Sequence, residues 1–248
     1  MKSSVPGTAF LLLVCCLAMI AASGCAPLHR ATSPHMPDFE EAQQVEIGGN
    51  AGTEGVHGKL GFAITDDYFA LAGISYLHSE RTEELQPTRH RTLEIAGGRQ
   101  WKVDGLPPEL FPPETTVQVL GGLVHGRSEA ETRSPLSEQQ RRGHLSGEYY
   151  KPYVQLNAIR PWIFGDVGAI TRLSVVQFDE IQNLSNPEET IRNPSTPAFV
   201  EVVAVQRFSL ADFRVELQMG YSAPIVGTPD VDSEFIHMSA GVTYRFSL

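Results

Sequence analysis

The residues with which this sequence could do acid–base chemistry are three histidines in extended stretches, His57, His125 and His237, together with scattered carboxylates. Catalysis by such groups usually accompanies a local pattern, such as a Ser-His-Asp context, the HExxH spacing of zinc enzymes or a glycine-rich nucleotide loop. The sequence contains none of these patterns. A dyad of histidine and carboxylate is the alternative, but we expect no enzymatic activity, no bound metal and no cofactor.

Charged side chains also alternate with apolar ones, which places them on one face of extended segments. These residues are Glu46, Lys59, Glu94, Arg172, Glu201, Arg207, Arg214, Glu216 and Arg245. Isolated charges in a confined interior are costly, so an enclosed face should hold them as pairs that fill the space. A path for an ion or polar solute is the alternative reading of the same face.

The elements that must position these charges are strands, because apolar and polar residues alternate with period two between turn signals. The segments are 44–51, 56–64, 68–77, 90–101, 116–125, 149–159, 167–178, 198–208, 213–221 and 235–248. We predict an all-β fold, a small antiparallel up-and-down transmembrane β-barrel of about ten strands, with eight as the alternative. Its apolar faces would point outward and its charges inward.

The last strand carries, in order, Ser239, Gly241, Tyr244 and Phe246. This order resembles the C-terminal assembly signal of bacterial outer-membrane β-barrel proteins, which has a polar residue, a glycine and two outward hydrophobic or aromatic residues. It departs from the family pattern because Ser247 and Leu248 follow the last aromatic residue. The resemblance implies that the barrel-assembly machinery is a partner.

Residues 1–24 have the lysine, the apolar run and the small residues of a secretory signal peptide. The cysteines are Cys15, Cys16 and Cys25, so the mature chain would hold a lone cysteine with no internal disulfide partner. The junction Ala22-Ser23-Gly24-Cys25 resembles the lipobox of bacterial lipoproteins, although Ala22 stands where leucine is usual. Ordinary cleavage at an A-x-A-like site is the alternative.

The lipobox resemblance implies that Cys25 is acylated and carries a palmitate-type anchor, that lipoprotein-sorting machinery is a partner, and that Ala26 directs the protein to the outer membrane. Residues 25–42 are rich in proline, histidine and acid and have no sustained period, which predicts a flexible tether. The barrel domain would then span residues 43–248.

The net charge of −10 argues against nucleic acid as a partner. The mature part has no apolar run near the ~20 residues of a membrane-spanning helix, so it would meet outer-membrane lipids as strands.

Long and short links alternate, which places the long ones on one end of the barrel and both termini on the other. In the resembled family the long loops face outside, so we expect periplasmic termini and a periplasmic anchor at Cys25. Two polar segments, 126–148 and 179–197, are predicted to be mobile extracellular loops.

We expect a structural or surface-binding role, with an unknown extracellular ligand and a lumen that conducts little. The alternatives are a membrane-anchored soluble lipocalin-like barrel that binds a small ligand, and a narrow porin.

Overall fold

The computed structural model describes residues 32–79, 88–103, 114–133, 142–163, 165–184, 186, 188, 190–210, 212–226 and 236–248. The predicted signal peptide, Cys25 and the first part of the predicted tether lie outside these residues. The strands are β1 (Gln44–Gly52), β2 (Gly55–Ala63), β3 (Tyr68–Ser79), β4 (Thr88–Lys102), β5 (Thr116–Arg133), β6 (Arg142–Trp162), β7 (Gly165–Val175), β8 (Gln177–Asn183), β9 (Thr190–Ile191), β10 (Ala198–Leu210), β11 (Phe213–Val226) and β12 (Ile236–Ser247). Among the described residues, no helix has the length and apolar character needed to cross a membrane.

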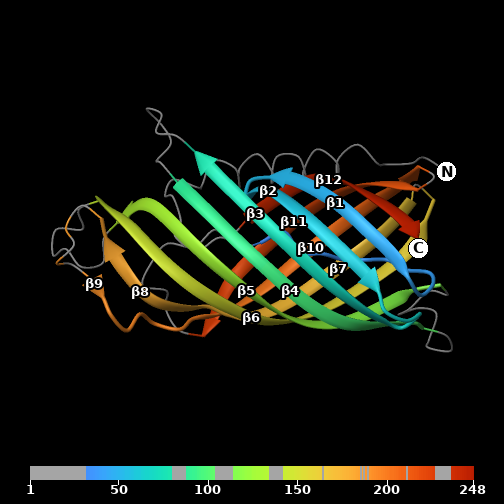
Figure 1. Ribbon diagram of the computed structural model, residues 1–248, viewed down its shortest axis with the longest axis horizontal. Coiled ribbons are helices and arrows are strands. Elements are labelled where there is room, and N and C mark those ends of the chain that lie inside the picture. The colour runs from blue at the N-terminus through green and yellow to red at the C-terminus, as the bar shows by residue number, and fades with distance from the viewer. Residues whose placement is uncertain are drawn as a thin grey trace, which may run out of the picture.

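Ten of the twelve strands close into an antiparallel barrel (Figure 1). Within the barrel, consecutive strands pair with one another in chain order. β7 pairs directly with β10, because β8 and β9 are the two strands that do not belong to the ring. The first and last strands close the ring, with Gln44 opposite Ser247 and Gly52 opposite Ser239. The predicted all-β barrel of about ten strands is confirmed.

The two faces of the wall have opposite polarity. On β10, Val202 is 51% exposed to the outside, whereas its neighbours Glu201 and Val203 are buried in the interior. Outward positions elsewhere are also apolar, among them Ile47, Leu60, Ile74, Leu93, Ile95, Val154, Leu156, Leu173, Leu217 and Val242. An apolar outside around a polar inside is the pattern of transmembrane barrels, and it is the reverse of a lipocalin. The lipocalin-like alternative is therefore wrong.

Exposed aromatic residues gather near the end of the barrel that holds the C-terminus, here called the terminus end. They are Tyr68, Trp101, Trp162, Phe213 and Tyr244. On β3 the next exposed tyrosine, Tyr76, is eight residues from Tyr68, which is roughly 20 Å along the axis for a tilted strand. This separation is close to the ~25 Å height of the apolar band of an outer-membrane barrel.

The opposite end, here called the loop end, is much taller on one side. The strands β5 and β6 pair over their full length, from Thr116 opposite Ile159 to Arg133 opposite Arg142. The prediction of a loop over 126–148 is therefore wrong, because only residues 134–141 separate these strands. Its polar composition misled the sequence reading, since a wall that rises above a bilayer can be hydrated on its outer face.

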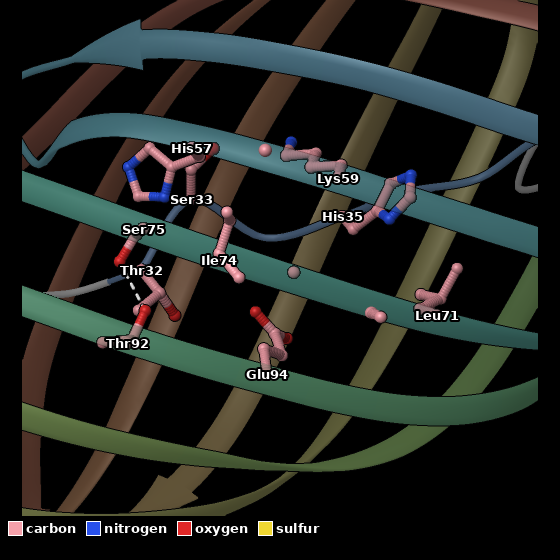
Figure 2. A pocket seen from close by; sticks show the side chains of 13 residues that line it. Thr32, Ser33, His35, His57, Lys59, Leu71, Ile74, Ser75, Thr92 and Glu94 are labelled. Atoms are coloured by element: carbon pink, nitrogen blue, oxygen red, sulfur yellow. Dashed lines mark hydrogen bonds between the residues drawn. The ribbon is translucent and has the colours of Figure 1, made fainter.

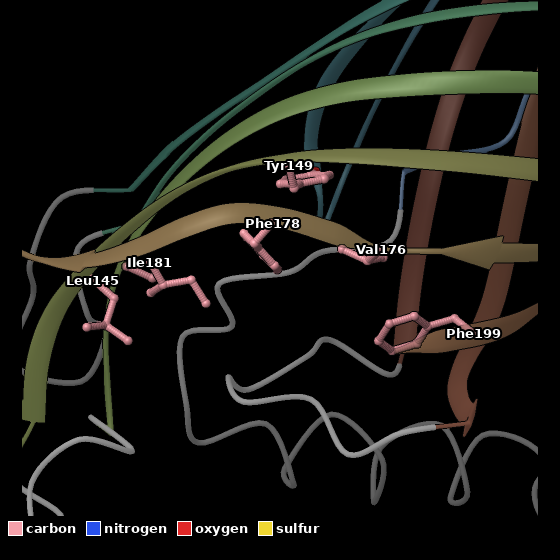
Figure 3. Close-up of a cluster of buried hydrophobic side chains, with 7 residues drawn as sticks. Leu145, Tyr149, Val176, Phe178, Ile181 and Phe199 are labelled. Carbon is pink, nitrogen blue, oxygen red and sulfur yellow. The ribbon is translucent and has the colours of Figure 1, made fainter. Parts of the chain in front are cut away.

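The second predicted loop, 179–197, is also partly strand. After a break at Val176, β8 takes over from β7 and pairs with the upper part of β6, and β9 pairs with β8. A core of seven buried apolar side chains supports this extension (Figure 3). The core consists of Ala130, Leu145, Tyr149, Val176, Phe178, Ile181 and Phe199. The tall wall is therefore a packed structure.

Candidate functional site, a lumen filled by the chain itself

Residues 32–41, here called the strap, run along the interior of the barrel as far as Phe39 and end in the exposed Glu40 and Glu41. Thr32, Ser33, His35, Met36 and Phe39 are all buried, and Figure 2 shows the first three behind β2, β3 and β4. The predicted flexible tether is thus wrong for this part of the chain. The sequence has no periodic signal here because the strap pairs with no strand and is held by side chains of the wall.

The backbone of the strap is bound by a series of wall donors. Each carbonyl from Pro34 to Phe39 accepts at least one hydrogen bond from a lumen side chain. The donors are Lys59 (3.2 Å) and Gln218 (3.0 Å) to Pro34, Gln155 (2.9 Å) to His35, Arg207 to Met36, Gln118 (2.5 Å) to Pro37, Arg214 (3.2 Å) and Arg245 (2.9 Å) to Asp38, and Gln100 (2.7 Å) to Phe39. Proline has no backbone N–H, so Pro34 and Pro37 suit a segment whose surroundings mainly supply donors.

Side chains of the strap complete the contact. Ser33 donates to Gln218 (2.8 Å) and accepts from Asn50 (2.5 Å). The imidazole of His35 lies 2.7 Å from Glu46, and Asp38 lies 2.9 Å from Arg214.

Two apolar anchors accompany these polar contacts. Met36 packs with Ile159, Ile170, Val203 and Val205, and Phe39 packs with Phe69 and its neighbours. The strap therefore behaves as a core element of the barrel.

All nine charged residues predicted for the lumen lie on the inner face of the wall. Near the middle, Lys151 lies 2.5 Å from Glu201, and Arg172 lies 3.3 Å from Glu94 and 4.0 Å from Glu201. The Arg172 guanidinium also stacks over the Tyr153 ring at 4.1 Å.

Nearer the terminus end, Arg207 lies 2.6 Å and Lys59 3.6 Å from Glu216, and Arg214 lies 3.7 Å from Glu46. Arg214 and Arg245 each have their nearest carboxylate on the strap, Asp38 at 2.9 Å and Glu40 at 2.6 Å.

Sequence reasoning missed several members of this network. Lys151 lies in the predicted strand 149–159 and shares a face with Gln155, which is also buried in the lumen, so the alternation alone could have found it. His35, Asp38 and Glu40 could not be found this way, because they belong to the strap.

The candidate histidines separate into two groups. His57 and His237 both approach the buried carboxylate of Glu54, at 3.4 Å and 3.8 Å. His125 instead stacks on Tyr150, with ring centroids 4.8 Å apart, on the outer face. Within the described residues no group of three or more ligands could hold a metal ion.

Between the strap and the β2–β4 wall lies a cavity bordered by Thr32, His57, Lys59, Ser75 and Glu94 (Figure 2). It has room for about one water molecule.

The residues of the assembly-signal resemblance lie on β12 at the closing seam. Ser239 faces the lumen and accepts from Asn50 (3.1 Å). At Gly241 a Cβ would come within 2.5 Å of the Asn50 side chain, so the close approach of β1 requires glycine. Tyr244 faces outward against Phe213 and Phe246, with centroids 4.9 Å and 5.7 Å away.

A closed antiparallel barrel with an apolar outer face and a polar, charged interior has the architecture of outer-membrane β-barrels. No family model matches the sequence, and no curated protein matches it.

Among solved structures, the translocator domain of the autotransporter NalP from Neisseria meningitidis is similar at 12% identity and a TM-score of 0.42, over 82% of this chain and 86% of that one. The beta domain of the Bordetella autotransporter BrkA is similar at 9% identity and a TM-score of 0.38, over 83% and 99%. At these values the class rests on the geometry of the barrel itself.

Proposed function

We propose that this protein is a lipid-anchored barrel of the bacterial outer membrane that does not conduct, has no enzymatic activity and serves as a rigid base for a surface-binding rim. The observation that carries this proposal is the strap. Its carbonyls, side chains and two apolar anchors occupy the lumen that a pore would need.

The tall wall of β5, β6, β8 and β9 is the part best suited to bind something. It rises beyond the apolar band, has its own packed core and carries exposed charges such as Arg127 and Glu148. A rigid scaffold that presents polar surface beyond a membrane is a common base for recognition. We place this wall outside the cell and the C-terminus in the periplasm, in keeping with the assembly-signal resemblance.

The partners in this proposal are outer-membrane lipids, the barrel-assembly and lipoprotein-sorting machinery, and an extracellular ligand that binds the tall wall. The excess of acidic residues argues against nucleic acid.

Conductance in planar bilayers tests the closed lumen. The full mature chain should give no steady current, whereas a chain in which residues 32–41 are replaced by glycine and serine should open small channels. The replacement keeps the length and removes the prolines, the ionic groups and both apolar anchors. Heat-dependent gel mobility shows that each barrel has folded. Large, stable, weakly selective channels from the unaltered chain would refute the proposal and indicate a porin.

Acylation is tested separately at Cys25. Metabolic labelling with a fatty acid should mark the wild-type protein and should not mark Cys25→Ala. Fatty-acid label of equal strength in the variant would show that the protein is not acylated at Cys25, and would refute this part of the proposal.

A further inference from the structure

The outer face of the barrel changes from apolar to basic on β4, just beyond the apolar band. Strands β3, β4, β5 and β6 lie side by side (Figure 1), and Tyr76 on β3 stands at the loop-end edge of the band. On β4 the outward residues Ile95 and Leu93 are 58% and 54% exposed. The next outward residues toward the loop end are Arg91 and Arg89, both exposed.

The same change occurs on β5, where the outward Leu123 is followed by His125 and then by Arg127. Arg91 and Arg127 are directly opposite one another in the register of β4 and β5, and both are exposed on the outer face. Side chains in such a pair have Cβ atoms about 5 Å apart, and like charges there are destabilising. The sheet therefore holds two guanidinium groups together at the edge of the membrane, although their repulsion costs stability.

Neighbouring carboxylates balance only part of this charge. Arg127 lies 3.4 Å from Glu129 and 3.7 Å from Glu148, and Arg89 lies 3.8 Å from Glu129. Arg91 makes no ion pair within the part of the chain that the structure describes. Three arginines thus face two carboxylates, which leaves a local excess of positive charge on a protein whose net charge is −10. An anion between Arg91 and Arg127 would remove both the excess and the repulsion.

The anions present at this depth are the phosphate groups of lipid headgroups, which begin where the apolar band ends. Tyrosine side chains favour the same depth, and Tyr76 is directly opposite Arg91, while Tyr150 is exposed on β6 nearby. The planar guanidinium group binds phosphate through paired hydrogen bonds. We propose that Arg91 and Arg127 together bind the phosphate of a lipid headgroup in the leaflet at the loop end. The acyl chains of this lipid lie against the apolar outer face of β4.

Binding of dimyristoylphosphatidic acid to the full mature chain tests this inference. The measurement uses dodecyl maltoside micelles, which contain no phosphate, and native mass spectrometry to follow the lipid-bound fraction as the lipid concentration rises. Arg91→Gln should weaken binding about fivefold, the contribution of one basic residue near an anionic headgroup. Arg127→Gln should weaken it at least as much, because Glu129 and Glu148 then lose their shared cation. The matched control is Arg160→Gln, which removes an exposed arginine from the outer face of β6 near the terminus end and should leave binding unchanged.

Three results would overturn the inference. Equal weakening by Arg91→Gln and Arg160→Gln would show that any exposed arginine attracts the lipid. Equal binding of dimyristoylglycerol, which lacks the phosphate, would show that only the apolar face is recognised. Displacement of the lipid by millimolar inorganic phosphate would show that the ligand is free phosphate. Heat-dependent gel mobility verifies that each variant has folded. Because the measurement involves neither conductance nor the orientation of the barrel in cells, its failure is distinct from a failure of the proposed function.

Discussion

Replacement of Glu201 by methionine should strongly destabilise the barrel, because this carboxylate lies between two buried cations. Lys151 and Arg172 are both fully buried, with side-chain nitrogens 2.5 Å and 4.0 Å from the Glu201 oxygens. Without Glu201, the two positive groups would face one another in a buried interior. Removing one partner of a buried ion pair costs about 3–5 kcal/mol.

The substitution Lys151→Met should lower the stability of the barrel less than Glu201→Met does. In Lys151→Met the Glu201 carboxylate keeps Arg172, whereas in Glu201→Met the Lys151 ammonium loses its closest carboxylate. The double variant Lys151→Met/Glu201→Met should be close to the wild type, because Arg172 keeps Glu94 at 3.3 Å and methionine fills a similar volume. Replacing a whole buried pair by apolar residues is often neutral or stabilising by about 1–4 kcal/mol.

Urea unfolding in detergent, followed by fluorescence of Trp101 and Trp162, measures these effects. With a denaturant slope of about 3 kcal/mol/M, a loss of 3–5 kcal/mol lowers the midpoint by roughly 1 M or more. Asp67→Ala is the control, because its pair with Arg99 is about half exposed on both sides and should contribute no more than about 1 kcal/mol. A Glu201→Met midpoint no lower than that of Asp67→Ala would refute the reasoning.

Two further predictions concern a turn and an exposed ion pair. Gly165→Ala should destabilise the protein by more than about 1 kcal/mol, since Gly165 has φ +110° and an added Cβ would clash with the Arg207 carbonyl oxygen. The control Gly121→Ala, whose added Cβ has its nearest contact at 3.8 Å, should leave the urea midpoint almost unchanged. Equal midpoints for the two variants would contradict this prediction. The hydrogen bond from Arg245 holds the pKa of Glu40 below its ordinary value of 4.5, so this pair stabilises the folded state above that pH and is lost as the pH falls. The midpoint difference between the wild type and Glu40→Gln should be present at pH 7 and should shrink as the pH falls below 4.5. A difference that does not change with pH in the acid range would rule out this ion pair as its source.

The barrel wall could be predicted because each membrane-crossing strand sorts its residues by a single rule. Alternation around Glu201 or Glu216 is visible in the sequence, since one face must suit lipid and the other a polar interior. The rule fails above the bilayer, where Ser128 and Glu148 lie in strands of mixed polarity. It also fails for β8, which is short and belongs to an extension with its own apolar core.

The strap could not be predicted for a different reason. Its donors come from seven wall strands that are far apart in the sequence, and no local pattern around Pro34 or Pro37 records them. Proline, histidine and acidic residues usually indicate a solvated linker. Here the polar interior of the barrel takes the place of solvent, so the same composition can be buried.

The threaded strap also restricts the order in which the molecule can fold. Its Ser33 is held between β1 and β12, through Asn50 and Ser239, and these are the two strands that close the ring. Once that seam has formed, the strap can enter only lengthwise, past the donors that would bind it at every step. The strap should therefore bind the inner face of the sheet while the sheet is still open. The pairing of β1 with β12 should then form last and close the barrel around it.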